Sequence, residues 1–559
     1  MSGPPAEQAG AQPIAAVAPQ PTGVEIPADD VDAGRDAPPS VDDPSDHVRV
    51  PQLLAPQRIG VLAGPGATAI PDLQLFGTDL GWTFEHRGEL TVLFGDTMPT
   101  ARFYCDTPQP AQDDTLAKLP LEFRPDVPPL SFVTVPGKPR ELATIRVNRG
   151  GSPLPMGLGS TPLTGWSDGE NAFAVMGHIE FTTCPVGSTD VCDANAGLTC
   201  VHDLGLCQPA VGDAVIGCDP MANASSANVG CALGQRCVAP EHGYCVDLGS
   251  SQYDGTRKSL PYAIARSAEL ALQNRADPSV FDSVHTFVSK KFHNPVVRTV
   301  KRLGTTRRDY DYAPGYGGLL MWGRPAYFAE QGRQGHLYLL RHVLPLDVQD
   351  ARLAFSPEFF AGVDPGSGEP RWSSAQRDAV AVALDGERNG DPAEPLTILN
   401  QMAISWLGAP IRKWIMLYAG DVPDVMLVDA AGAQATRGPL RVRYADYPWG
   451  PFSAAETYLV PGSPDEAGAA YGPGGYLYHY ACRDQPGQAC AQSDPVRPLD
   501  AIVPGCPTPA VQLDVGRLYG VNIIDAYTRP SRAGLDITWN VSTWNPYAVL
   551  LMRSHVEPR

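Results

Sequence analysis

The chain has 559 residues, of which 43% are hydrophobic and 8% aromatic, so it can bury a substantial core and is not disordered as a whole. Its formal net charge of −19 argues against nucleic acid or an anionic membrane surface as the main partner. No run of about 18 apolar residues occurs, so the sequence predicts no transmembrane helix.

The first part of the chain differs from the rest in composition. Residues 1–50 contain nine acidic residues, two arginines and nine prolines, with almost no aromatic side chains. Such a segment cannot bury enough apolar surface to offset the entropy lost on ordering. The sequence therefore predicts a disordered tail over residues 1–54 and a folded region over residues 55–557. No export signal is visible at the start, which reads "MSGPPAEQAG".

The folded region opens with a β-hairpin pattern over residues 74–99, "QLFGTDLGWTFEHRGELTVLFGDTMP". Asp79 and Asp96 lie at the end of this hairpin away from its turn. An even-numbered loop pairs the two directly, with Cβ atoms about 5 Å apart. A three-residue loop with Gly88 in the left-handed conformation turns them to opposite faces, and the apolar alternation slightly favours this register. In both registers the two aspartates stay near one end of the sheet.

A cysteine-rich insert over residues 184–245 contains two copies of one pattern with four cysteines each. The spacings are irregular and no CxxC motif occurs, which favours disulfide bridges over zinc ligation. A module of this size with few large apolar residues depends on its bridges for stability. The cysteines expected to be bridged within the insert are Cys184, Cys192, Cys200, Cys207, Cys218, Cys231, Cys237 and Cys245.

Four further cysteines lie outside the insert. Cys482 and Cys490 flank a turn-rich loop and are expected to form a local bridge, which leaves Cys105 and Cys506 for each other. A cysteine content of this kind is typical of an oxidising compartment. We therefore expect a secreted or cell-surface protein.

The rest of the chain is a series of strand-length apolar runs bounded by Gly, Pro and Asp turns, which predicts an all-β protein. One stretch, residues 259–285, fits either strands or a helix. Radial repetition of five sheets would protect the strand edges, although a jelly roll or two sandwiches fit the pattern as well. The runs form five clusters, at about residues 70–135, 145–300, 310–350, 395–445 and 450–555.

Seven short phrases resemble a bacterial secreted family that was first catalogued as a domain of unknown function. They are "GTDLG" (77–81), "LFGDT" (93–97), "MWGRP" (321–325), "EFFAGVD" (358–364), "WIMLYAG" (414–420), "YPWGPF" (447–452) and "STWNPY" (542–547). The resemblance covers nearly all of residues 58–555 and implies a five-bladed β-propeller. The cysteine-rich insert is not part of the family pattern and falls in a hairpin of the second blade. Some members of that family are endo-D-arabinofuranases, which cut the arabinan of mycobacterial cell walls.

The resemblance also implies that Asp79 and Asp96 carry out carboxylate chemistry. Cleavage of a glycosidic bond needs two carboxylates, about 5 Å apart for retention or about 6.5–9.5 Å apart for inversion. The alternative role for each aspartate is a hydrogen bond to turn amides beside Gly77, Gly81 and Gly95. Calcium ligation is a third reading, although no EF-hand-like spacing appears.

Weaker candidates are side chains that could contact a sugar, with a structural role as the alternative for each. They are Arg324, Trp322, Trp449 and Trp544. Glu358 and Asp364 are candidate accessory acids, with an ordinary loop role as the alternative.

The sequence thus predicts a secreted glycoside hydrolase that acts on a furanose polysaccharide such as D-arabinan. It predicts no required cofactor, with calcium as the one candidate ion, and no nucleic-acid partner. The alternative is a non-catalytic surface protein that binds glycan or protein through the propeller and the cysteine-rich insert.

Overall fold

The chain divides into two units, residues 1–49 and residues 50–559, and the computed structural model describes residues of the second unit. The described residues are 50–64, 75, 77–98, 113–148, 153–155, 161–182, 198–201, 206–209, 235–238, 244–247, 264–287, 292–324, 337–349, 352–384, 398–420, 426–428, 434–436, 440–459, 517–544 and 548–559.

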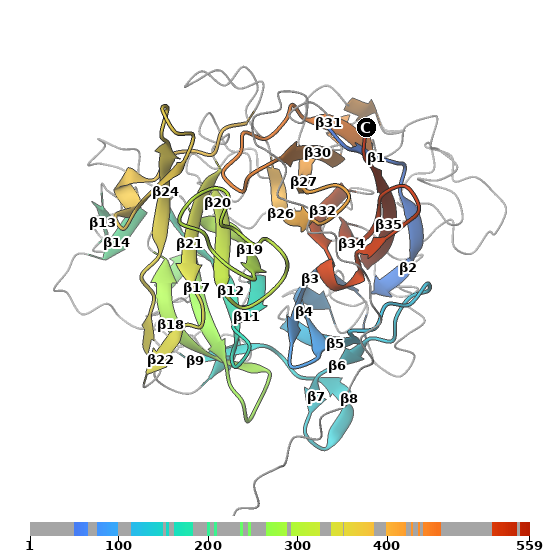
Figure 1. Ribbon diagram of the computed structural model, residues 1–559. Coiled ribbons are helices and arrows are strands. Elements are labelled where there is room, and N and C mark those ends of the chain that lie inside the picture. The colour runs from blue at the N-terminus through green and yellow to red at the C-terminus, as the bar shows by residue number, and fades with distance from the viewer. Residues whose placement is uncertain are drawn as a thin grey trace, which may run out of the picture. The chain divides into compact units, whose positions relative to one another are not determined.

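Five sheets of four or more strands make up most of this part of the chain (Figure 1). We number them as blades one to five along the chain. Blade one has the strand order β3 (Gly77–His86), β4 (Glu89–Met98), β5 (Asp113–Pro120), β6 (Ser131–Phe132). Blade two has the order β11 (Thr161–Ser167), β12 (Ala172–Thr182), β17 (Ile264–Gln273), β18 (Val280–Phe287), β9 (Arg146–Asn148), β10 (Leu154–Pro155).

The other three blades have the same layout. Blade three has the order β19 (His293–Val300), β20 (Gly318–Arg324), β21 (Tyr338–Val343), β24 (Glu358–Val363), β25 (Pro370–Ser373). Blade four has the order β26 (Ile398–Leu407), β27 (Lys413–Gly420), β30 (Leu440–Ala445), β31 (Glu456–Leu459). Blade five contains β32 (Arg517–Ile523), β34 (Leu535–Trp544) and β35 (Ala548–Glu557), with β33 (Arg529–Pro530) on β34 and both β1 (Gln52–Leu53) and β2 (Gln57–Ala63) on β35.

Short hairpins and two 3₁₀ turns complete the described elements. The hairpins are β7 (Thr134–Val135) with β8 (Lys138–Leu142), β13 (Leu198–Val201) with β14 (Leu206–Pro209), β15 (Gln235–Val238) with β16 (Tyr244–Asp247), β22 (Asp347–Gln349) with β23 (Arg352–Ala354), and β28 (Met426–Val428) with β29 (Gln434–Thr436). The 3₁₀ turns are η6 (Gln376–Asp378) and η8 (Asp525–Tyr527).

The first long strand of each blade lies at one edge of its sheet, and these five edge strands form a closed ring. β3 contacts β11, β11 contacts β19, β19 contacts β26, β26 contacts β32, and β32 contacts β3 again. A ring of inner edge strands is the arrangement of a β-propeller, in which radial repetition protects the strand edges. The prediction of an all-β, five-bladed propeller is therefore confirmed for the described residues.

The N-terminal strands complete the sheet of blade five. β1 and β2 add antiparallel to β35, so blade five is built from both ends of the folded unit. Gln52 pairs with Glu557 at this junction. The propeller thus begins a few residues before the predicted boundary, because residues 52–53 form a strand and do not belong to the tail.

The space between the blades is filled by large aromatic side chains. Each blade contributes a fully buried tryptophan, and these are Trp82, Trp166, Trp322, Trp414 and Trp539. A tryptophan can bury about 150–250 Å² of surface, so this residue is among the largest single contributions to the core of each blade. The aromatic runs of the sequence therefore serve mainly to pack neighbouring blades together.

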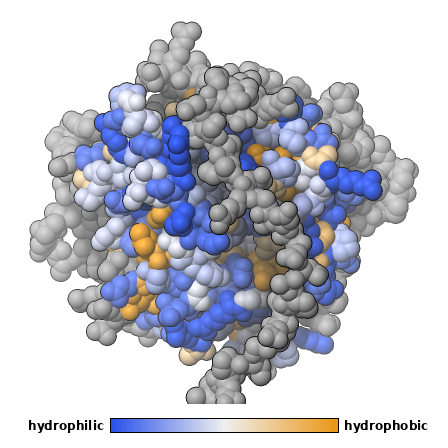
Figure 2. Space-filling model, in the orientation of Figure 1, coloured by the Kyte–Doolittle hydropathy of each residue, from blue (hydrophilic) through white to orange (hydrophobic). Residues whose placement is uncertain are grey.

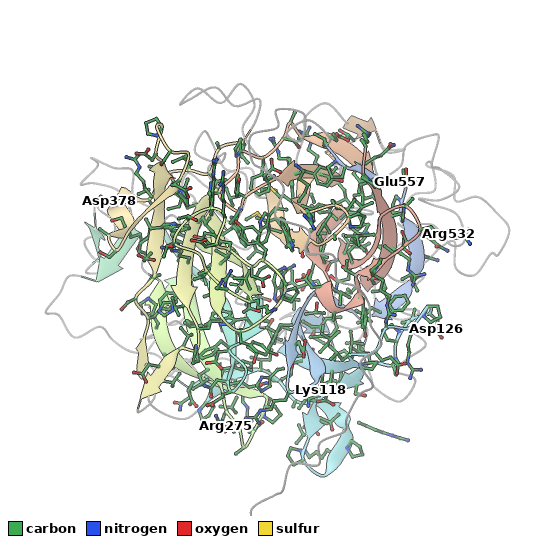
Figure 3. All side chains as sticks on the ribbon, in the orientation of Figure 1. Lys118, Asp126, Arg275, Asp378, Arg532 and Glu557 are labelled. Atoms are coloured by element: carbon green, nitrogen blue, oxygen red, sulfur yellow. The ribbon has the colours of Figure 1, made fainter. Side chains whose placement is uncertain are left out.

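The surface of this unit is polar. Figure 2 shows mostly hydrophilic described residues on one face, with small apolar areas. The charged residues labelled in Figure 3 lie at the periphery of the sheets, among them the exposed Asp126 and Arg275. No helix among the described residues is long and apolar enough to cross a membrane.

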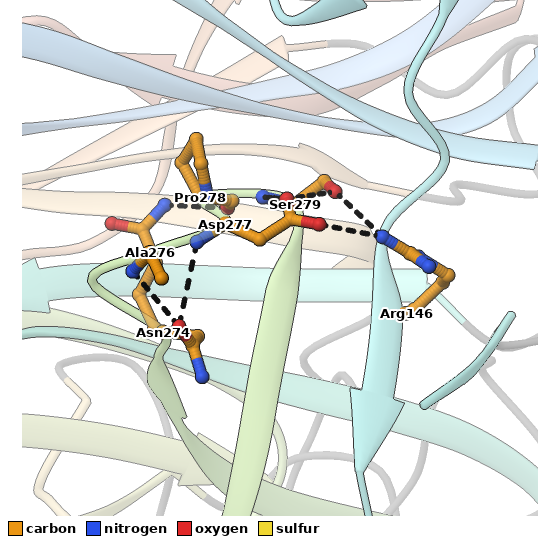
Figure 4. A network of polar contacts seen from close by, with 7 residues as sticks. Arg146, Asn274, Ala276, Asp277, Pro278 and Ser279 are labelled. Carbon is orange, nitrogen blue, oxygen red and sulfur yellow. Dashed lines mark hydrogen bonds and ion pairs between the residues drawn. The ribbon is translucent and has the colours of Figure 1, made fainter. Parts of the chain in front are cut away.

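A polar network fixes the parallel strand β9 on blade two (Figure 4). Arg146 donates to Asp277 Oδ2 at 2.7 Å, while Ser279 donates to Asp277 Oδ1 through its amide at 3.0 Å and through its hydroxyl at 2.6 Å. Partial burial would raise the pKa of Asp277, but the Ser279 hydrogen bonds and the Arg146 charge together lower it. The turn between β17 and β18 is in this way attached to β9.

Two hairpins of the cysteine-rich insert fall within the described residues. Cys200 is the cross-strand partner of Cys207, and Cys237 is that of Cys245. The third and fourth cysteines of the two copies therefore occupy equivalent backbone positions, as an internal repeat requires. The other cysteines lie outside the described residues, so the bridges stay a prediction; they are Cys105, Cys184, Cys192, Cys218, Cys231, Cys482, Cys490 and Cys506.

Candidate functional site

The turn of the first hairpin is a two-residue loop. Arg87 and Gly88 both have positive φ, at 52° and 79°, and His86 pairs with Glu89. Positive φ at both central residues is the geometry of a type I′ turn. The favoured expectation of a three-residue loop is therefore wrong near the turn.

A β-bulge then changes the register before Asp79 is reached. Trp82 pairs with Leu93 and Leu80 with Phe94, so Gly81 is the extra residue on β3. Beyond the bulge Asp79 lies opposite Gly95 and not opposite Asp96. Neither of the two simple registers holds over the whole hairpin.

Polar side chains of blade five stabilise this bulge. Leu80 has a φ of 65°, and its amide donates to Ser542 Oγ at 2.7 Å. The carbonyl of Gly81 accepts from Asn540 Nδ2 at 2.6 Å. A bulge that exposes buried backbone groups is stable only when these groups find partners, and here blade five supplies them.

Asp79 is buried, with 5% of its surface exposed, and lies at the start of the inner strand β3. The hydroxyl of Tyr519 donates to Asp79 Oδ2 at 2.9 Å. Tyr519 is itself near the start of the inner strand β32. Blade five thus holds the Asp79 side chain in place through the hydroxyl of Tyr519.

Asp96 lies in a second bulge, on β4. Phe94 pairs with Thr115 and Thr97 with Asp113, so Gly95 and Asp96 together oppose the single residue Asp114. Asp96 has a φ of 28° and is partly buried, and its amide donates to Asp114 Oδ1 at 3.1 Å. Bulges of this kind re-aim side chains and are frequent next to active sites.

Asp114 is a third carboxyl group that the sequence reasoning missed. Its side chain is buried, with 3% exposure. Burial raises the pKa of Asp114 well above its ordinary value, the charge of Asp96 raises it further, and a hydrogen bond with Thr161 lowers it in part. Thr161 begins the inner strand β11 of blade two. The second flanking blade thus contributes a hydroxyl to this group of carboxylates.

A ladder of threonines lies beside the three aspartates. The hydroxyls of Thr78 and Thr97 are 2.9 Å apart, and those of Thr97 and Thr115 are 2.8 Å apart. Each threonine is the chain neighbour of one aspartate, and successive side chains of a strand point to opposite faces. Three adjacent strands therefore direct threonines to one side and aspartates to the other.

Gly95 allows the carboxylates and hydroxyls to come close together. A Cβ atom at this position would lie 2.6 Å from Asp79 Oδ1 and 2.3 Å from Thr161 Oγ1. Any side chain at residue 95 would occupy space that the site needs. The glycine of "FGDT" is thus required by close packing.

A buried cation lies towards the opposite end of the inner strands. Arg298, near the end of β19, forms an ion pair with Asp525 at 3.1 Å and lies 4.8 Å from the ring of Trp82. Ser405 of blade four also donates to Asp525. These contacts join four blades, so the aspartate cluster and the Arg298 ion pair lie towards opposite ends of the inner strands.

Two of the predicted sugar-contacting residues are buried in the core. Trp322 is fully buried and donates to the carbonyl of Pro448 at 2.8 Å, and Trp449 is 2% exposed and stacked on Tyr447. Neither indole offers an open face to a sugar. The side chains of Arg324 and Trp544 are outside the described part of the structure.

The candidate accessory acids also lie apart from the cluster. Glu358 is half-exposed and forms an ion pair with Arg341 at 2.8 Å. Asp364 is exposed and accepts from the amides of Gly366 and Ser367, which lower its pKa. Asp364 thus has a turn-stabilising contact, whereas Glu358 begins β24 and pairs across strands with Arg341. No group of three or more His, Cys, Asp or Glu side chains is placed to hold a metal ion within the described ranges.

No protein-family model matches this chain. No curated protein matches it either.

Several solved structures are similar to it at low identity. An α-L-arabinofuranosidase from Podospora anserina, in complex with cellotriose, shares 8% identity at a TM-score of 0.33 over 91% of this chain and 99% of its own. The haemagglutinin-neuraminidase ectodomain of parainfluenza virus 5 shares 7% identity at a TM-score of 0.34, over 91% and 85%. A Trypanosoma rangeli sialidase in complex with the inhibitor DANA shares 6% at a TM-score of 0.29, over 90% and 59%. At these identities and TM-scores the similarity does not indicate the activity of this chain.

Proposed function

We propose that this protein is a glycoside hydrolase that cleaves a furanose polysaccharide such as D-arabinan, with Asp79 and Asp96 as its carboxylate pair. The observation that carries the proposal is the gathering of carboxyl groups from adjacent strands of blade one, where Tyr519 of blade five donates to Asp79 and Asp114 accepts the Asp96 amide. Buried carboxyl groups whose neighbours perturb their ionisation are typical of catalytic sites. The sequence phrases around both aspartates support the same assignment.

The contacts of the two aspartates support different roles in such a reaction. One carboxyl group must protonate the leaving oxygen, and the other must be ionised to attack the sugar or to activate water. Asp79 suits the ionised role, because the Tyr519 hydroxyl donates to it and a donated hydrogen bond favours a carboxylate. Asp96 suits the acid role, because it is the more exposed of the two and can regain a proton from water.

The test is hydrolysis of a panel of arabinans and other glycans by the purified chain. Asp79→Asn and Asp96→Asn keep the side-chain shape but remove acid–base capacity, so each should lower kcat/KM by about 10²–10⁴-fold with little change in melting temperature. Asp126→Asn, in an exposed loop of the same blade, is the matched control and should behave as wild type.

Two outcomes would contradict the proposal. Full activity combined with a lowered melting temperature in both active-site variants would assign the aspartates to turn stabilisation. Glycan binding without any cleavage by the wild-type chain would favour the non-catalytic alternative.

A further inference from the structure

Asp114 has no part in the chemistry proposed above, yet its surroundings are specific. It is the single residue opposite the Gly95–Asp96 bulge, and its Oδ1 accepts the Asp96 amide at 3.1 Å. It also interacts with the hydroxyl of Thr161 from the next blade. These contacts come from two blades and converge on one buried side chain.

We propose that Asp114 is a positioning residue of this site, whose carboxyl group accepts the Asp96 amide and stabilises the left-handed backbone that orients the Asp96 side chain. The proposal rests on the proposed function of Asp96. It adds a residue that acts through Asp96 and need not touch the substrate.

The backbone of Asp96 needs such support. Its φ of 28° lies in the region that L-residues rarely adopt, and conformations of this type cost about 1–3 kcal/mol unless the surroundings stabilise them. An acceptor fixed opposite the bulge stabilises this conformation directly, because the amide of Asp96 is the donor. The side chain of Asp114 is in turn immobilised by burial, with 3% of its surface exposed.

A protonated carboxyl group can accept the Asp96 amide without adding a negative charge beside the other carboxyl groups. The charged groups that act on Asp114 are Asp96 on β4 and Asp79 on β3, and the group facing it from β11 is the Thr161 hydroxyl. Burial and these two charges raise its pKa by more than the Thr161 hydroxyl and the Asp96 amide lower it, so Asp114 stays neutral to a higher pH than an ordinary aspartate. A neutral acid accepts the amide without repelling Asp96. Once ionised, it would add a negative charge beside Asp96 and so change the pH at which Asp96 loses its proton.

The experiment compares Asp114→Asn, Asp114→Ala and the control Thr115→Val in the full chain. Asparagine keeps an acceptor oxygen and imitates the neutral acid, whereas alanine removes the acceptor. We expect Asp114→Ala to lower kcat by about 10²-fold, as expected for a misplaced catalytic group, with KM little changed. Asp114→Asn should recover at least tenfold of that loss and should lack the change in the pH profile that ionisation of Asp114 causes in wild type. Thr115→Val, in the ladder on the opposite face, should lower stability and leave the pH profile unchanged.

Two readouts do not depend on turnover. The infrared spectrum of wild type should contain the carbonyl stretch of a protonated carboxylic acid that Asp114→Asn lacks at the same pH. A crystal structure of Asp114→Ala should show residue 96 moved out of the left-handed region. These results would support the proposal for Asp114 even if no glycan were cleaved, so that the failure of the proposed function would be recognised separately.

Equal loss of kcat in the asparagine and alanine variants would overturn the proposal, because it would mean that Asp114 transfers a proton itself. Wild-type kcat in both variants, or an unchanged residue 96 in the alanine structure, would also overturn it.

Discussion

Replacement of Gly95 by alanine is the most direct test of the site geometry. The methyl carbon would lie 2.3 Å from Thr161 Oγ1, 2.6 Å from Asp79 Oδ1 and 2.8 Å from Leu80 Cδ1. All three separations are far below the contact distance of about 3.5–4.0 Å between non-bonded heavy atoms. The backbone of residue 95 does not have the positive φ at which alanine would be strained. The loss of stability expected for Gly95→Ala therefore comes from steric overlap alone.

The surrounding groups cannot all move away. Asp79 is held by Tyr519, and Leu80 belongs to a bulge held by Ser542, so the added methyl group must displace fixed parts of the site. Overpacking of this kind costs about 1–3 kcal/mol of stability. A displacement of about 1 Å at a catalytic group can lower turnover by about 10²-fold. We therefore expect Gly95→Ala to fold with a lowered melting temperature and to lose most of its hydrolytic activity.

Gly88→Ala provides the matched control. Gly88 has a φ of 79° and no atom within 4 Å of a built Cβ, so alanine there costs about 1–2 kcal/mol of backbone strain without filling any space. Thermal unfolding and kcat/KM should be measured for both variants. Our reasoning would be refuted if both lost stability to the same degree and Gly95→Ala retained wild-type kcat/KM.

Three further predictions concern other parts of the chain. Because burial raises the pKa of Asp114 in the folded state, wild type should lose stability as pH rises from the ordinary carboxyl range towards the folded-state pKa. Asp114→Asn should therefore melt higher than wild type at neutral pH, with no gain below about pH 4, as thermal scans across pH will show. Tyr519→Phe removes the donor to Asp79 and should lower kcat/KM by at least about tenfold and stability by about 1.5–3 kcal/mol, the value of a hydrogen bond to a charged group. Removal of residues 1–49 should leave the melting temperature and activity unchanged, and a shift of several degrees would show that they pack on the fold.

The strand clusters predicted an all-β protein and the resemblance of seven phrases implied the five-bladed propeller, but neither could predict the register of its first hairpin. The apolar alternation of residues 80–94 favoured one register, and the turn chemistry of Arg87–Gly88 adopts the other. Gly81 resolves the conflict because it is an extra residue on β3. Residues 82–86 follow the register that the turn sets, and residues 79–80 follow the register shifted by one. The partners that make this bulge stable, Ser542 and Asn540, are more than 450 positions away in the chain. No local pattern contains that information.

The candidate site was predicted only in part for the same reason. Asp79 and Asp96 belong to one hairpin and could be recognised together. Asp114 lies beyond residues 99–112 and joins the cluster through the third strand of the blade. A local signal did exist, because each of the three aspartates has a threonine as its chain neighbour. Tyr519 and Thr161 come from other blades, and only the closed ring brings them to this position.

The dependence on other blades links the proposed site to the closure of the propeller. Asp79 receives a hydrogen bond from Tyr519 of blade five, so this carboxyl group is not held by blade one alone. Blade five is itself completed by β1 and β2 from the start of the folded unit. At the other end of the inner strands, the ion pair of Arg298 with Asp525 joins blade three to blade five. The groups that would cleave a glycan are therefore arranged only when both ends of the folded unit have met, which makes the geometry of the site a property of the whole ring.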